Sequence, residues 1–131
     1  MQLNQPIPDI TIGPVTRAML ALYAGASGDH NPIHIDSDFA KAAGQPDVFA
    51  HGMLSFGALT RVVTEWAGQD RLRSFGARFT SITNLHDVIT CSGKVVERFE
   101  EDGRPLLRVA LAATAQDGRA TLLGEAIIED R

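Results

Sequence analysis

A carboxylate and an imidazole flank a stiff turn in the most polar stretch of the chain, residues 27–36. Pro32 ends any helix there and biases Asn31 toward an extended backbone, so Asp29 and His34 can project into one space. Such a pair can polarise a shared water molecule and transfer its proton. The spacing therefore favours acid–base catalysis by Asp29 and His34. In the structural alternative, Asp29 only caps the turn and His34 packs as a half-buried histidine.

A second candidate lies at residues 49–54, where a long helix is expected to begin. No Ser, Thr, Asp or Asn stands between Val48 and Leu54, so the first helical amides lack an obvious side-chain cap. At Gly52 a ligand oxygen can approach the backbone, and the helix dipole favours an oxygen that gains negative charge. This pattern predicts an oxyanion hole for a carbonyl that becomes an enolate. The alternative is that water or a distant carboxylate completes the cap.

The remaining histidines and the cysteine receive structural interpretations. His51 is interpreted as a buried residue that holds the turn into the long helix, with proton transfer as its alternative. His30 and His34 are four residues apart, but Pro32 between them breaks the helical face that a paired metal site would use. We therefore expect no metal site. Cys91 has no internal disulfide partner, which is consistent with a reducing compartment.

Three helices are expected in the first half of the chain. Residues 16–22 form the first, with Thr16 as the N-cap and Gly25 or Gly28 as the stop, and residues 38–43 form the second, capped by Asp36 or Ser37. The third helix covers residues 52–67, and its apolar residues occupy about half of the helical wheel. Its first two turns carry no charge, so we expect a sheet to bury it. The apolar face comprises Met53, Phe56, Leu59, Val62, Val63 and Trp66.

The second half of the chain has the two-residue period of half-buried strands. Four strands are expected, around residues 75–80, 89–95, 107–115 and 122–128, with Asp-Gly turns at 102–103 and 117–118. The last three strands then form an antiparallel meander. The order of elements predicts an α+β domain whose sheet wraps the long helix. Such a sheet exposes an edge, which favours dimerisation.

Composition narrows the possible partners and location. The chain has 131 residues, a net charge of −4 and 44% apolar residues, which suits one domain over residues 1–131. Without a basic cluster, nucleic acid is not an expected ligand. No apolar run is long enough for a membrane span, and residues 1–6 lack the features of a signal peptide. A cytoplasmic location is therefore the expectation.

The two polar clusters, in this order, resemble the hydratase motif of MaoC-type (R)-specific enoyl-CoA hydratases and 3-hydroxyacyl dehydratases. The matching segments read Ser27-Gly28-Asp29-His30-Asn31-Pro32-Ile33-His34 and Ala50-His51-Gly52-Met53-Leu54. The resemblance extends from the helix at Thr16 to the final strand. It implies a single hot-dog fold that dimerises, with Asp29 and His34 as the catalytic pair. It also implies that the Gly52 amide binds the thioester oxygen.

Further roles follow from the same resemblance. Asn31 matches the orienting position of the motif, and Ser27 and His51 are expected to support it, whereas Met53 and Phe56, together with Phe79, are expected to shape the acyl pocket. The ligand would be an enoyl thioester of CoA or of acyl carrier protein, with no cofactor. A subunit of a heterodimeric dehydratase, a thioesterase and a thioester-binding module remain alternatives, since one fold serves all of them.

One segment departs from the family pattern. Family members often have a Pro-Gly-Asp turn before the second strand, whereas this chain reads Asn84-Leu85-His86-Asp87. The aspartate is retained and the turn glycine is not. The departure concerns the shape of the nearby pocket mouth, not the catalytic pair.

Overall fold

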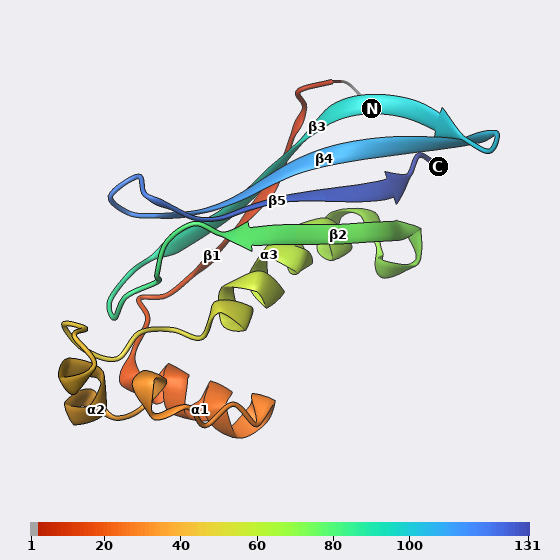
Figure 1. The fold of residues 1–131 in the computed structure, drawn as a ribbon. Helices are drawn as coiled ribbons and strands as arrows, with labels where there is room; N and C mark the ends of the chain where they lie inside the picture. Colours follow the sequence, from red (N-terminus) through yellow and green to blue (C-terminus); the bar gives the residue numbers. More distant parts are fainter. Residues whose placement is uncertain (1–2) are drawn as a thin grey trace.

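One antiparallel sheet and one long helix form the body of the molecule, which a computed structural model describes for residues 3–131 (Figure 1). Two residues of the segment considered for a signal peptide, Met1 and Gln2, lie outside this range. The described residues form five strands, in the sheet order β1-β3-β4-β5-β2. These are β1 (Pro6–Ile12), β2 (Leu72–Phe79), β3 (Ile89–Glu101), β4 (Arg104–Ala115) and β5 (Ala120–Glu129).

The last three strands form the expected meander, because tight turns join them in sequence. At the β3–β4 turn, Asp102 and Gly103 have φ angles of 53° and 76°, the left-handed region that an Asp-Gly pair tolerates. β2 returns to pair antiparallel with β5, and Phe75 lies opposite Ala126. β2 therefore forms one edge of the sheet and β1 forms the other.

Strand β1 was not expected from the sequence. Pro6 and Pro8 interrupt its pattern, yet both are compatible with an edge strand, where one side of the backbone needs no partner. It pairs antiparallel with β3, Ile10 opposite Cys91, with an irregularity between Ile7 and Ile10. The sheet thus has one strand more than the four predicted.

Helix α3 (Gly52–Ala67) lies along one face of the sheet, with the bounds expected from the sequence. Its buried side chains, among them Leu59, Val62 and Val63, pack against Ile89, Val109 and other inward residues of the strands in one core. Burying apolar surface of this kind stabilises the fold by roughly 25 cal/mol per Å². The sheet and α3 form the rigid layer on which the other elements rest.

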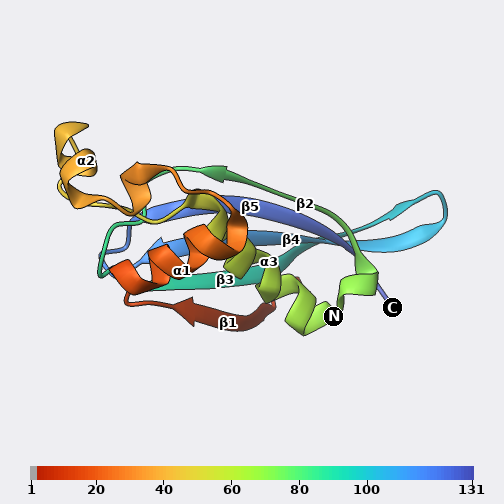
Figure 2. The same cartoon turned by 90° about the horizontal axis from the view of Figure 1, so that it is seen from below.

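Two short helices lie beyond α3, on the same side of the sheet (Figures 1 and 2). Helix α1 (Arg17–Ser27) begins after Thr16, whose side chain accepts a hydrogen bond from the Met19 amide, and ends at Gly28 with a φ of 77°. Helix α2 (Ser37–Ala42) is capped by Asp36. A separate small core holds these elements together, comprising Val15, Leu20, Ala40, Val48 and Ala50.

Candidate active site

The turn that carries Asp29 is fixed by its own side chains. The Ser27 hydroxyl accepts a hydrogen bond from the Asp29 amide at 3.2 Å, and the Asp29 carboxylate accepts one from the Asn31 amide at 3.2 Å. The side-chain oxygen of Asn31 accepts a third from the Ile33 amide at 3.1 Å. Asp29 therefore does cap the turn. Its carboxylate is also exposed, and an ionised carboxylate has capacity for further partners.

His34 projects from the 3₁₀ turn Pro32–His34 and is half-buried. Its Nδ1 lies 2.8 Å from the carbonyl oxygen of Phe49, and its ring meets the Phe49 ring edge-on. Because a carbonyl only accepts, Nδ1 carries the proton in this contact. The neutral ring then presents Nε2 as a hydrogen-bond acceptor, which is the form that can take a proton from water.

His51 connects the two predicted catalytic residues. It is buried, with 2% of its surface exposed, and its Nε2 donates to the backbone carbonyl of Asp29 at 3.1 Å. Its ring stacks on that of His34, with centroids 4.0 Å apart, and contacts Tyr23 edge-on. Burial lowers the pKa of His51, an effect that the Asp29 carbonyl opposes and nearby His34 reinforces. His51 is thus buried, as the sequence favoured.

The structure brings Asp29, His34 and His51 together, with one ligand-capable atom of each within 4.8 Å of the others. Aspartate and histidine side chains can bind metals. The trio includes His34 but not His30, the other histidine of the pair considered from the sequence. In a tetrahedral zinc site, neighbouring ligand atoms lie only about 3.3 Å apart, given bonds of about 2.0 Å. Separations of up to 4.8 Å leave room for a water molecule between these atoms, and one nitrogen of each histidine already contacts a backbone carbonyl.

The start of α3 lies beside this trio, with His51 at the N-cap and no side-chain cap hydrogen bond. Within residues 3–131, the amides of Gly52 and Met53 have no acceptor, while the Leu54 amide donates to the His51 carbonyl at 3.1 Å. Two amides at the positive end of the helix dipole are thus available for a ligand oxygen. This is the arrangement that the sequence predicted as an oxyanion hole.

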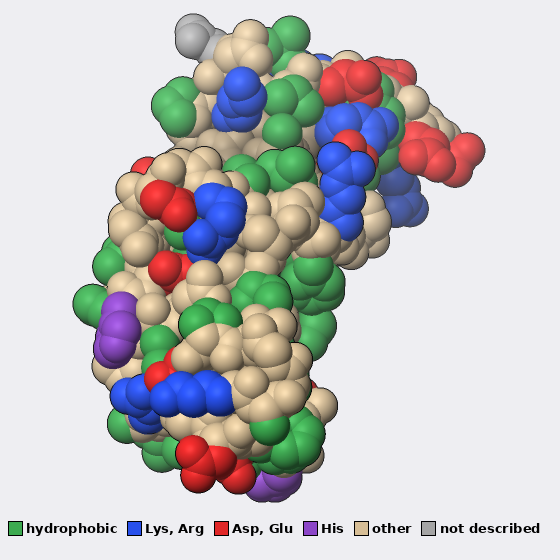
Figure 3. Space-filling view, turned by 60° about the vertical axis from the view of Figure 1, so that its left-hand side comes forward, with side chains coloured by type: hydrophobic (Ala, Val, Ile, Leu, Met, Phe, Trp, Pro, Cys, Tyr) green, Lys and Arg blue, Asp and Glu red, His purple; other side chains and the backbone are tan. Residues whose placement is uncertain are grey.

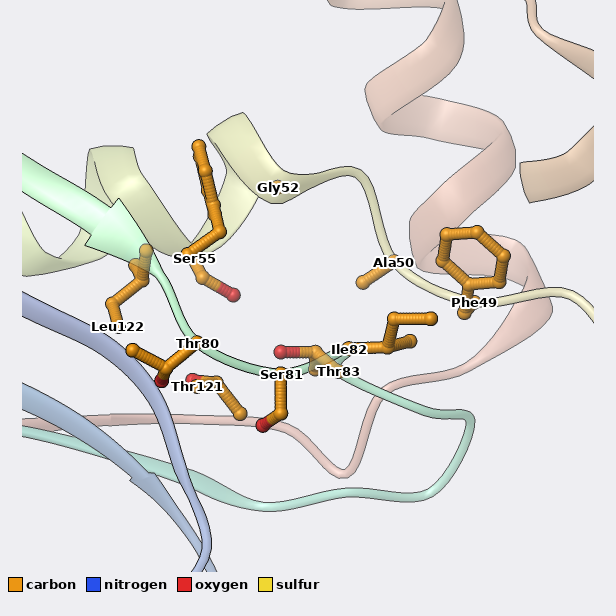
Figure 4. Close-up of a pocket in the computed structure, with 11 residues that line it drawn as sticks. Phe49, Ala50, Gly52, Ser55, Thr80, Ser81, Ile82, Thr83, Thr121 and Leu122 are labelled. Atoms are coloured by element: carbon orange, nitrogen blue, oxygen red, sulfur yellow. The ribbon is translucent and has the colours of Figure 1, made fainter.

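A pocket of about 330 Å³ opens on the other side of the segment that leads into α3 (Figure 4). It shares Gly52 with the candidate oxyanion hole, but Asp29 and His34 do not line it. Its walls come from the segment that leads into α3, the first turn of α3, the end of β2, the loop after β2 and the start of β5. They comprise Phe49, Ala50, Gly52, Ser55, Phe79, Thr80, Ser81, Ile82, Thr83, Thr121 and Leu122.

The residues expected to shape an acyl pocket lie partly elsewhere. Met53 is 55% exposed, and neither Met53 nor Phe56 lines the pocket. Phe56 packs instead against Phe75 of β2, edge to face at 5.1 Å between centroids. Phe79 does line the pocket and faces α3, as its strand period predicted, but it is 56% exposed. The edge position of β2 explains this, because the described chain places nothing beyond it.

The loop after β2 is held by a buried carboxylate that the sequence retained from the family pattern. Asp87, 5% exposed, accepts hydrogen bonds from the Asn84 amide at 2.8 Å, from Gln116 at 3.1 Å and from Arg119 at 2.8 Å. Arg119 also donates to the Ser81 hydroxyl and to the Ile82 carbonyl, both at 3.1 Å. This network positions the pocket wall, and sequence reasoning missed it because its members are far apart in the chain.

The surface view in Figure 3 shows acidic and basic side chains side by side, with no extended basic face on that side. The described residues form ion pairs such as Arg17 with Asp47 and Arg119 with Asp117. Among the described residues, no helix has the length and apolar character needed to cross a membrane.

A long helix packed on one face of an antiparallel sheet defines a hot-dog domain. The chain belongs to the MaoC-like domain family, whose model matches residues 4–116. The expected hot-dog fold is thereby confirmed, because solved structures of this family superimpose over essentially the whole chain.

Three relatives illustrate the similarity. The (R)-hydratase PhaJ1 of Pseudomonas aeruginosa is 28% identical, with a TM-score of 0.80 over 98% of this chain and 81% of that chain. A chain of the ChsH1–ChsH2 complex of Mycobacterium tuberculosis is 25% identical, with a TM-score of 0.82 over 99% and 98%. The fatty acid synthase β subunit of Aspergillus oryzae is 38% identical over 115 residues. That match covers 85% of this chain but only 6% of the synthase subunit.

Proposed function

We propose that this domain adds water to the double bond of trans-2-enoyl thioesters, giving (R)-3-hydroxyacyl thioesters, and catalyses the reverse dehydration. The single observation that carries the proposal is the position of Asp29, His34 and the free Gly52 amide around one segment, residues 49–52. The likeness to an (R)-hydratase supports the stereochemical assignment. As a proposed activity this is a hydro-lyase reaction that needs no cofactor.

In the proposed reaction, the thioester carbonyl oxygen accepts a hydrogen bond from the Gly52 amide. A water molecule held between Asp29 and His34 attacks C3, and the pair takes one of its protons. Electrons of the C2–C3 double bond move toward the carbonyl, whose oxygen becomes an enolate oxygen at the start of α3. The enolate then collapses as a proton is delivered to C2, so that H and OH have been added across the bond. The helix dipole stabilises the intermediate charge.

The test is hydration of crotonyl-CoA by the purified chain, followed as loss of the enoyl absorbance. Asp29→Asn and His34→Ala should each lower kcat about 10²- to 10⁴-fold, the usual contribution of a general acid or base. His30→Ala is the matched control, because His30 is an exposed histidine of the same turn, and its ring bonds the Gly28 carbonyl at 3.2 Å. Full activity of either dyad variant, with unchanged circular dichroism, would refute the assignment.

The same assay separates the other reactions that a hot-dog domain supports. A thioesterase would release free thiol, which a thiol-reactive dye detects, whereas hydration leaves the thioester intact. A thioester-binding module would bind butyryl-CoA without turning over crotonyl-CoA. Comparing one enoyl chain on CoA and on acyl carrier protein then identifies the preferred carrier, and a series of chain lengths gives the acyl range.

We further propose that the chain works as a dimer that joins along the exposed β2 edge. Phe79 on this edge is 56% exposed and lies against Gly52, so a partner there would also cover the pocket. A homodimer that is active alone supports this assembly. An inactive chain that becomes active with a different hot-dog subunit would indicate a heteromeric dehydratase, in line with the likeness to the ChsH1–ChsH2 complex.

A further inference from the structure

Ser55 presents a buried hydroxyl with no partner inside the pocket. It is 3% exposed, and its Oγ makes no hydrogen bond with any described residue. It lies one turn into α3 from Gly52, and both residues line the pocket. Figure 4 shows its oxygen directed into the pocket, away from the axis of α3.

The other hydroxyls around the pocket give a useful contrast. Thr80 and Ser81 both donate to the carbonyl of Ala120, at 2.7 and 2.8 Å, and Thr121 donates to that of Ala113 at 3.2 Å. These hydroxyls are part of the protein's own hydrogen bonding. Thr83 is 6% exposed, and Figure 4 shows its hydroxyl directed into the same space as that of Ser55.

A buried hydroxyl without a partner is costly. Leaving such a group unpaired costs about 1–3 kcal/mol, which is why buried hydroxyls in proteins are nearly always bonded. A plain alkyl chain in this pocket would leave Ser55 unpaired and also exclude the water that could satisfy it. A ligand with its own donor or acceptor at this depth would remove the penalty.

We infer that Ser55 and Thr83 bind a hydrogen-bonding group of the thioester ligand, an amide or an oxygen substituent within about five atoms of the carbonyl carbon. The inference rests on the proposed function, because it takes the carbonyl to lie at Gly52. The three residues from Gly52 to Ser55 advance the helix by about 4.5 Å. An extended chain covers that distance in about four bonds, so the group must lie close to the thioester.

Two parts of a thioester can supply such a group. On the sulfur side, the arm shared by CoA and acyl carrier protein has an amide nitrogen four atoms from the carbonyl carbon. On the acyl side, a hydroxyl at C5 places an oxygen five atoms away. The chemistry at Ser55 is the same in both cases, and ligands changed on one side at a time tell the two apart.

The experiment measures the Kd of saturated thioesters, which bind without reacting. For the sulfur side, the S-butanoyl thioester of N-acetylcysteamine is compared with S-pentyl butanethioate, which has the same chain length without the amide. For the acyl side, 5-hydroxypentanoyl-CoA is compared with hexanoyl-CoA. Each ratio is measured in the wild type, Ser55→Ala and Thr83→Val. Thr64→Ala is the matched control, because Thr64 is a hydroxyl residue of α3 that does not line the pocket.

The wild type and Thr64→Ala should prefer the polar member of one pair by roughly tenfold or more, the value expected for one buried hydrogen bond. Ser55→Ala should bring that ratio to near one, mainly by tightening the alkyl ligand, and Thr83→Val should reduce it. The responding pair identifies the side of the thioester that occupies the pocket. Equal ratios in wild type and Ser55→Ala for both pairs overturn the inference. Because no turnover is measured, that result leaves the hydration proposal standing, and absence of crotonyl-CoA hydration leaves the binding ratios interpretable.

Discussion

The imidazole rings of His34 and His51 are stacked, with centroids 4.0 Å apart and 26° between their planes. The His51 Nε2 also donates to the Asp29 carbonyl at 3.1 Å. One buried side chain therefore contacts both members of the proposed catalytic pair. A charge on the His51 ring would lie directly against the His34 ring, so the stacking and the burial both favour neutral His51.

Protonation of His51 should make stability depend on pH. Its pKa in the folded protein is lowered below the ordinary value of 6.5, chiefly by burial. The unfolded chain then binds more protons than the folded chain once the pH falls below about 6.5, so the free energy of unfolding decreases there and is unaffected well above it. Urea denaturation across this range measures the slope. His51→Gln should flatten it, whereas His30→Gln, at an exposed position, should not; equal slopes in wild type and His51→Gln would contradict the prediction.

Gly52→Ala tests the candidate oxyanion hole. A Cβ at this position would lie 2.6 Å from Cε1 of Phe79, so the exposed Phe79 ring must move aside. We expect a folded protein with crotonyl-CoA hydration lowered at least tenfold, because the methyl group crowds the amide that would hold the thioester oxygen.

The double variant Gly52→Ala/Phe79→Ala separates the two effects. It should regain the stability lost through the clash, measured by thermal denaturation, but not the activity. Recovery of both would show that the displaced ring, and not the crowded amide, had caused the loss of rate.

Arg119→Met tests the network behind the pocket wall. The substitution leaves the Asp87 carboxylate buried without its charged partner, and Arg119 itself is only one-third exposed. We expect a loss of about 1–3 kcal/mol in the free energy of unfolding, measured with urea. The double variant Arg119→Met/Asp87→Asn should lose less free energy of unfolding than the two single variants lose together.

The matched control for this network is Arg61→Met. Arg61 pairs with Glu65 one turn along α3, and both side chains are more than half exposed. Its removal should cost no more than about 0.5 kcal/mol. Equal costs at Arg119 and Arg61 would mean that the Asp87 network adds nothing beyond a surface ion pair.

His86 occupies the position where family members often have a turn glycine, and it has the backbone conformation of one, with a φ of 70°. This conformation costs a non-glycine residue about 1–2 kcal/mol in the folded protein. The greater flexibility of glycine in the unfolded chain offsets part of the advantage that glycine would have. His86→Gly should therefore raise the Tm by a few degrees. His86→Val, with a branched Cβ, should lower it. A lower Tm for His86→Gly would mean that the His86 side chain stabilises the turn through contacts of its own.

The sequence predicted the parts of the molecule that depend on neighbouring residues. Thr16, Gly28 and Asp36 act as caps where they were expected, because a cap contacts only residues within one helical turn. Helix α3 also begins at Gly52, as expected. The juxtaposition of Asp29 and His34 follows from the turn that joins them, residues 29–34, as much as from the fold. In these segments the conformation that neighbouring residues favour is also the one that the folded protein adopts.

The parts that were missed depend on residues distant in the chain. The two prolines of β1 hid a strand that only its pairing with β3 reveals. The alternation of residues along β2 correctly predicts that Phe79 faces α3. It does not predict that Phe79 is exposed, because β2 lies at the edge of the sheet. The environments of Ser55 and Arg119 are created by the loop after β2, which is distant from both residues in the chain, so no local pattern marks them.

The small core around Val15, Leu20 and Ala40 is separate from the main core between α3 and the sheet. The turn with Asp29 and His34 packs on this minor core through Ile33, so we expect the turn to open while the strands remain paired. Amide hydrogen exchange should accordingly be faster in residues 16–44 than in β4. On gentle heating, we expect the proposed hydration activity to be lost before the circular dichroism signal of the β-sheet. Thermal inactivation would then begin in residues 16–44.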